Sequence, residues 1–239
     1  MILVIAGRSV MRQLGLAGAA APGHPGLAAL EPSGLSAAGW AHDPDAPGND
    51  RMALGGEIVP ASRLTAVITA IDAVQPADLP HVRSDDQGFV AAEMTAFLRS
   101  WLMTLDCPVL DRPAALALSG SAGDDAVWSR AAAALGVPDR RHIPVPRLRS
   151  HAVTVVGGQV LGQAAEPAAT AAIALAAAAG VTAARLTIGD DPAQPALYGA
   201  VPWSHAPSQP ALHALLAHAH ELSDNTVAPG VLSPSGVSR

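Results

Sequence analysis

The chain opens on an uninterrupted apolar run, residues 1–5, which Gly7 soon ends. Such a run followed by a turn is typical of a strand that is buried on both faces, and strands of this kind form parallel sheets covered by helices on each side. A second apolar run, residues 64–71, fits the same sheet. We therefore expect an α/β fold built on a mostly parallel sheet.

The middle of the chain alternates between helical and extended patterns. Apolar residues at helical spacing predict a helix over 88–105, a short strand follows at 107–110, and a second helix over 124–135 stops at Gly136. The preceding stretch, 15–49, is rich in Gly, Pro and Ala, and we expect loops with one short helix there.

A second block begins near residue 151. It consists of a hairpin around Gly157-Gly158, a helix over 167–179, strands at 183–188 and 197–201, and a final helix over 210–222. Residues from 223 onward are rich in Pro, Ser and Gly, so we expect a flexible tail.

Composition limits the partners. The net charge is −6 and all 14 basic residues are Arg, so the broad basic face that a nucleic-acid binder needs is not expected. The cluster Arg140, Arg141, His142, Arg147 and Arg149 is interpreted as a solvated loop. The Ala-rich stretch 168–179 is too short to span a bilayer, and the single Cys107 cannot form an internal disulfide. We expect a cytoplasmic protein with no nucleic-acid or membrane partner.

Several segments together resemble a known family. They are 89–93 (FVAAE), 101–102 (WL), 107–113 (CPVLDRP), 131–138 and the hairpin with the helix and strands that follow it. In this order they resemble bacterial RimK-like ATP-grasp proteins. The family's third strand typically ends in Asn-Arg-Pro, and Asp111 occupies the Asn position here. The resemblance implies a pre-ATP-grasp-like N-terminal domain with helices on both faces of its sheet, and a smaller α/β lobe that matches the end of an ATP-grasp domain.

The chain departs from this family where ATP would bind. Only residues 139–150 correspond to the family's nucleotide-binding lobe. That lobe supplies lysines, and this chain contains no Lys. The family's Mg²⁺-binding strand corresponds to 197–203, which contains no carboxylate, and Asp190 and Asp191 are interpreted as an exposed turn. We expect no metal and no cofactor. The implied domains are 1–138, a short linker at 139–150, a remnant lobe at 151–222 and the tail at 223–239.

Candidate ligand-binding residues lie where predicted strands end. Arg8 and Arg112 follow the first and third strands, and two arginines there are candidates to hold an anion or a peptide carboxylate. Tyr198, Trp203 and His205 lie at the end of the last strand, where open sheets place ligands, although core packing is the competing role for Trp203. No catalytic residue is identified. The Ser/Gly loop at 119–123 is interpreted as the entry to a helix.

Two functions are consistent with these features. The first is a non-catalytic binding or partner subunit in a peptide-modification or natural-product pathway. The alternative is an enzyme with repurposed chemistry, or one that completes an ATP-dependent ligase site with a partner chain. The hairpin at 153–162 is apolar on successive positions, so both of its faces need cover. We expect a homodimer or a heteromer through this hairpin, with a peptide as a candidate substrate, unless the final helix folds back over it.

Overall fold

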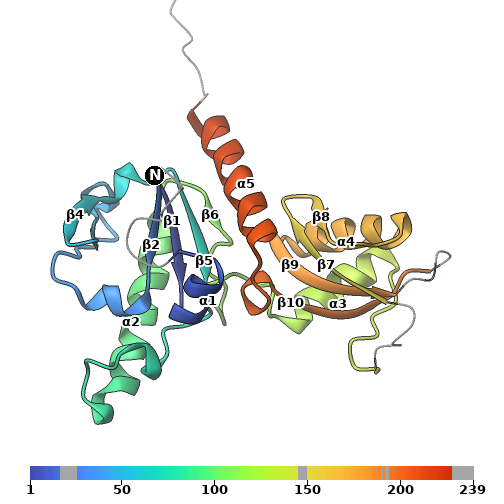
Figure 1. The fold of residues 1–239 in the computed structure, drawn as a ribbon, viewed down its shortest axis with the longest axis horizontal. Coiled ribbons are helices and arrows are strands. Elements are labelled where there is room, and N and C mark those ends of the chain that lie inside the picture. Colours follow the sequence, from blue (N-terminus) through green and yellow to red (C-terminus); the bar gives the residue numbers. More distant parts are fainter. Residues whose placement is uncertain (17–25, 145–149, 190, 192–193, 228–239) are drawn as a thin grey trace, which may run out of the picture.

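The computed structural model describes residues 1–16, 26–144, 150–189, 191 and 194–227. A parallel sheet with the strand order β2-β1-β5-β6 and an antiparallel sheet with the order β10-β9-β7-β8 lie on either side of a long helix, α5 (Figure 1). A separate two-stranded ribbon, β3-β4, completes the N-terminal half. The expected α/β class is confirmed.

The helices are α1 (Arg8–Gln13), α2 (Ser84–Thr104), α3 (Asp125–Leu135), α4 (Glu166–Ala179) and α5 (Gln209–Val227). The strands of the N-terminal half are β1 (Ile2–Ala6), β2 (Leu27–Leu30), β3 (Arg51–Leu54), β4 (Glu57–Pro60), β5 (Ala66–Ala70) and β6 (Val109–Leu110). Those of the C-terminal lobe are β7 (Ser150–Val156), β8 (Gln159–Leu161), β9 (Ala183–Gly189) and β10 (Leu197–Pro202).

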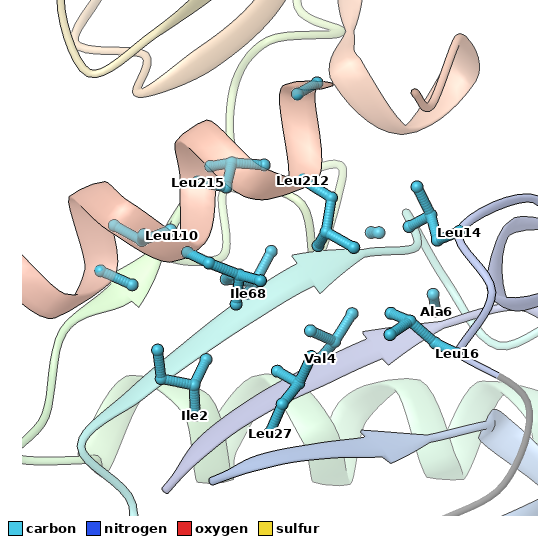
Figure 2. Close-up of a cluster of buried hydrophobic side chains, with 14 of the residues drawn as sticks. Ile2, Val4, Ala6, Leu14, Leu16, Leu27, Ile68, Leu110, Leu212 and Leu215 are labelled. Carbon is cyan, nitrogen blue, oxygen red and sulfur yellow. The ribbon is translucent and has the colours of Figure 1, made fainter. Parts of the chain in front are cut away.

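The parallel sheet is covered on both faces, as expected. Leu3 and Ile5 of β1 point into a core with Leu98 and Trp101 of α2, whereas the alternate residues of β1 point the other way. On that second face α5 supplies the cover, and Figure 2 shows Leu212 and Leu215 lying over the side chains of β1 and β5. The sheet of the N-terminal half is therefore completed by a helix from the other end of the chain.

Helix α5 covers one face of the expected hairpin. The hairpin formed by β7 and β8 is covered within the chain: Val156 packs in the core that α5 shares with the parallel sheet, and Val153 and Val155 pack with α3 and α4. All three valines are at most 2% exposed. The apolar stripe of α5 and the helices of the lobe occupy the two faces of the hairpin, which is the alternative stated above, and association with another chain stays a prediction.

The stretch before β5 also differs from the prediction. Strand β2 forms within 15–49, where loops with one short helix were expected, whereas α1 and the β3-β4 ribbon form in stretches for which no element was predicted. The sequence of β2 is Leu-Ala-Ala-Leu, and alanine has low strand propensity, so its strand state depends on pairing with β1. Helix α5 continues to Val227 instead of ending at residue 222, since a helix satisfies its own backbone hydrogen bonds beyond the core. Residues 228–239 of the expected tail lie outside the described residues.

The first part of the linker is bound to the C-terminal lobe. Arg141 forms ion pairs with Asp139 at 2.8 Å and Asp125 at 2.5 Å, and its side chain is 13% exposed. Arg140 donates to the hydroxyl of Tyr198 at 3.1 Å. The interpretation as a solvated loop is wrong for Arg141, whose side chain is largely buried against the lobe, whereas Arg140 is exposed despite its contact with Tyr198. Arg147 and Arg149 lie outside the described residues.

Candidate functional site

A crevice of about 200 Å³ opens at the C-terminal end of β5. There β1 and β5 end side by side, with Ala6 opposite Ala70, and the chain runs from β1 to β2 on one side before it returns to β5 on the other. In open α/β sheets ligands bind at such a reversal of strand order. The crevice is lined by Asp72, Ala114, Ala115, Leu116, Ala117, Gly120, Ser121, Gly123, Asp124 and His205.

Asp72 is the polar centre of this crevice. Its Oδ1 accepts a hydrogen bond from Ser119, which is 5% exposed, and its Oδ2 lies 3.1 Å from Nε2 of His205. The side chains of Asp72 and His205 are 40% and 52% exposed, so both remain accessible to a ligand. Carboxylates accept hydrogen bonds, and a mouth built around Asp72 and Asp124 therefore favours ligands that donate N–H groups or carry positive charge.

The loop at 119–123 is a helix entry, as interpreted. Asp124 is the N-cap of α3 and accepts a hydrogen bond from the backbone N–H of Ala126 at 2.8 Å. A carboxylate thus already occupies the helix N-terminus that an anionic ligand would need.

The five predicted ligand residues are spread over the molecule. His205 lines the crevice, whereas Arg8 forms a 3.2 Å ion pair with Glu31 beside a separate cavity of about 90 Å³. Arg112 donates to the carbonyls of Leu102 and Leu105, both at 3.2 Å, and so caps the end of α2. The structure does not bring Arg8 and Arg112 together in any described contact.

The two aromatic candidates have structural contacts. Tyr198 is 9% exposed and accepts the hydrogen bond from Arg140. Trp203, 3% exposed, packs in the core beneath α5. A ligand-binding role for the five residues stays a prediction, and the crevice supports it most directly for His205.

Sequence reasoning missed Asp72 and Ser119 as members of this site. A signal was present for Asp72, because it directly follows the apolar run at 64–71, where a carboxylate at a strand end is conspicuous. Ser119 carried no comparable signal, since it is 47 positions from Asp72 and only the fold brings the two together.

Asp111 joins the two halves of the chain. It directly follows β6, and its carboxylate accepts the backbone N–H of Thr182, just before β9, at 3.0 Å. A Cβ at Gly120 would lie 2.5 Å from the Cβ of Asp111, so this contact requires glycine, which also has a φ of +86°. Burial raises the pKa of Asp111 above its usual range, although hydrogen bonds from Thr182 oppose the shift.

Replacing Asp111 with Asn should make the stability of the protein less sensitive to rising pH. A carboxyl group whose pKa is raised in the folded state stabilises fully only below its unfolded pKa of about 4, and that stability is lost as pH rises through the folded pKa. The advantage of Asp111→Asn over wild type in urea denaturation should therefore grow from pH 4 to pH 7.

Asp139→Asn is the matched control with the opposite sign. A hydrogen bond from Arg141 lowers the pKa of Asp139, so the stability from this carboxylate is present at neutral pH and is lost on acidification. This variant should be less stable than wild type at pH 7, with a deficit that shrinks below about pH 4. Parallel pH profiles for wild type and Asp111→Asn would contradict the role given to burial.

The face of the antiparallel sheet that points away from α3 and α4 carries no carboxylate on β9 or β10. Its facing pairs are Thr187 opposite Gly199 and Arg185 opposite Val201. Within the described part of the chain, no group of three or more His, Cys, Asp or Glu residues is placed to hold a metal ion. Asp190 lies outside the described residues. Among the helices that the structure describes, none is both long and apolar enough to cross a membrane.

No protein-family model matches the chain, and no curated protein matches it. Solved structures do. The ATP-grasp ligase PsnB, complexed with a phosphomimetic variant of its minimal precursor, Mg and ADP, aligns with a TM-score of 0.58 at 12% identity over 91% of this chain and 98% of that chain. The macrocyclase MdnC from Microcystis aeruginosa MRC, bound with precursor peptide MdnA, gives 0.58 at 11% identity over 92% and 98%. The macrocyclase MdnB from the same organism gives 0.54 at 12% over 95% and 99%. Likeness at such low identity concerns the fold, and the fold of this chain is ATP-grasp-like.

Proposed function

We propose that this chain is an ATP-grasp-like protein that is non-catalytic as a ligase and acts as a peptide-binding or partner subunit in a peptide-modification or natural-product pathway. The observation that carries the proposal is the accessible, carboxylate-centred crevice at the reversal point of the parallel sheet, on a scaffold whose other sheet offers Thr187, Gly199 and Arg185 on its open face. Structures of similar fold, PsnB and MdnC, were each solved with a precursor peptide.

The chemistry of the crevice supports a peptide as its ligand. The side chains of Asp72 and His205 are each more than a third exposed, and both can form hydrogen bonds with the amide groups of a peptide. The wall beside them is apolar: Leu116 is 81% exposed and Ala114, Ala115 and Ala117 accompany it. Polar groups flanked by exposed apolar surface are typical of a protein or peptide contact.

The polar chemistry of nucleotide binding is poorly represented. The chain has no Lys, and an Arg does not act as the compact point charge that Lys places on phosphates. Residues 139–144 are tied to α3 through Arg141. We infer that the short linker to which they belong, residues 139–150, replaces the nucleotide-binding lobe of the RimK-like family.

MgATP should therefore not bind the isolated protein with useful affinity. In titration calorimetry we expect no saturable heat below about 1 mM nucleotide, equivalent to a binding free energy weaker than about −4 kcal/mol. A one-to-one isotherm with a micromolar Kd would contradict the proposal and favour the alternative, an ATP-dependent enzyme. A saturable isotherm that appears after a partner chain is added would favour a ligase site completed in trans.

The binding role can be tested by photocrosslinking in the native host. A benzophenone amino acid placed at Leu116, on the crevice wall, should trap a peptide or partner protein. The same group at Phe89, which is 71% exposed and does not line the crevice, is the matched control. We expect a defined adduct from position 116 that is weakened by Asp72→Ala. Equal adducts from both positions, or an adduct indifferent to Asp72, would contradict the assignment of the crevice.

A further inference from the structure

A second polar cluster lies under α2, away from the crevice, and nothing in the proposed function uses it. Nδ1 of His42 lies 2.8 Å from Oδ2 of Asp50, and Nε2 of the same ring lies 2.8 Å from Oγ of Ser100. The side chains of His42 and Asp50 are 5% and 1% exposed. A carboxylate, an imidazole and a hydroxyl are thus aligned in series across two segments of the chain, the loop at 42–50 and α2.

Hydrogen bonds around Asp50 select the orientation of the imidazole. Oδ1 of Asp50 accepts the backbone N–H of Asp43 at 3.0 Å, and Oδ2 faces the ring of His42. The ionised carboxylate accepts the Nδ1 proton, which leaves Nε2 with a free lone pair directed at Ser100. The edge of the Phe97 ring packs against the imidazole at a centroid distance of 5.9 Å and restricts it to this position.

Ser100 differs from the other hydroxyl residues in the same helix. Thr95 and Thr104 both donate to backbone carbonyls one turn back, the usual choice for a hydroxyl inside a helix. Ser100 points instead at His42. The side chains of the acid and the base are buried, whereas the serine residue is partly exposed.

A cavity of about 170 Å³ lies near this cluster, but none of His42, Asp50 and Ser100 lines it. Thr104, one helical turn beyond Ser100, lines it, and so does Ala61, whose N–H donates to the carbonyl of Asp50 at 2.9 Å. Leu64 and Leu105 give it apolar walls.

We propose that Ser100, His42 and Asp50 form a nucleophilic site that accepts small activated acyl esters. Oγ of Ser100 attacks the acyl carbonyl carbon while its proton passes to Nε2 of His42, and Asp50 holds the ring and stabilises the imidazolium. The ester C–O bond breaks, and the leaving alcohol takes the proton from His42. Water then attacks the acyl-serine with the same base, which releases the carboxylic acid and restores the hydroxyl.

The chain contains its own comparison for this site. Ser36 and His81 also lie 2.8 Å apart, but no described contact places a carboxylate on the other nitrogen of His81. If a serine–histidine contact were sufficient for reactivity, both serines would react alike. If the buried Asp50 matters, Ser100 should react far faster, because an oriented general base contributes roughly 100-fold or more.

A fluorophosphonate probe on the full-length protein, followed by peptide mapping, tests the proposal. We expect labelling of Ser100 at least about tenfold above Ser36, loss of that adduct in Ser100→Ala, and a drop of at least about tenfold in Asp50→Asn. p-Nitrophenyl acetate should give a burst of nitrophenolate that Ser100→Ala abolishes. Melting temperatures separate loss of reactivity from loss of folding in the variants.

Peptide mapping of the labelled wild-type protein tests the proposal even if Asp50→Asn fails to fold. No adduct at Ser100, or equal labelling of Ser100 and Ser36, would overturn the proposal and leave the cluster as a structural tie between the loop at 42–50 and α2. The crosslinking result at Leu116 is independent of this outcome, since it concerns a different cavity.

Discussion

Replacing Val155 with Glu should unfold the C-terminal lobe. Val155 is 1% exposed and lies in the core formed by the antiparallel sheet with α3 and α4, where Trp128 and Leu175 are fully buried. A carboxylate placed there has no described cationic partner in that core, and burying an unpaired charge costs about 4 kcal/mol or more. We expect loss of the cooperative urea transition for this lobe, low solubility and exchange-broadened amide signals.

The adjacent position gives the matched control. Thr154 points to the opposite face of β7 and pairs with Arg185 of β9 in the antiparallel register. Thr154→Glu adds the same charge beside a cation, so its effect should stay within about 0.5 kcal/mol. A Val155→Glu protein that keeps its melting temperature and changes only its mass in light scattering would show that this surface is an interface between chains.

Truncating Leu215 to Ala should destabilise the protein by about 3 kcal/mol. Leu215 is completely buried where α5 crosses the parallel sheet (Figure 2), and the same core includes Val156 and Ala183 of the C-terminal lobe. The loss should therefore be felt on both sides of α5. Hydrogen exchange should accelerate at amides of β1 and β5 and also at those of β7.

Leu116→Ala removes the same atoms from a residue that is 81% exposed, and its effect should be within about 0.5 kcal/mol. If Leu215→Ala destabilised the protein no more than this control, α5 would not be the element that holds the two sheets together. Acceleration confined to the parallel sheet would show that the C-terminal lobe is stable without it.

Local chemistry explains which parts of the fold were predictable. Gly136 ends α3 with a φ of +65°, and Gly157-Gly158 forms the turn between β7 and β8, because glycine adopts these conformations at little cost. The strand state of Ala28 and Ala29 was not predictable, since it depends on pairing with β1. The role of α5 was not predictable either, because an apolar stripe does not specify which sheet it covers.

The candidate site follows the same division. His205 was expected from its place at a strand end, and it does line the crevice. Its partner Asp72 is 133 positions away, and the contact of His42 with Ser100 likewise joins segments 58 positions apart. Contacts of this kind depend on how the sheets and α2 are placed in space, which the periodicity of a sequence does not encode.

The shared core of β1 and α5 has a consequence for how the protein is made. Ile2 and Leu212 belong to the same cluster, yet β1 leaves the ribosome first and α5 follows only after both sheets have been synthesised. At about 5–20 residues per second, one face of the nascent parallel sheet lacks its helix for a time on the order of ten seconds. During that interval the apolar side chains of β1 and β5 are open to chaperones, and premature release of the nascent chain before α5 would yield a product with no means of covering them.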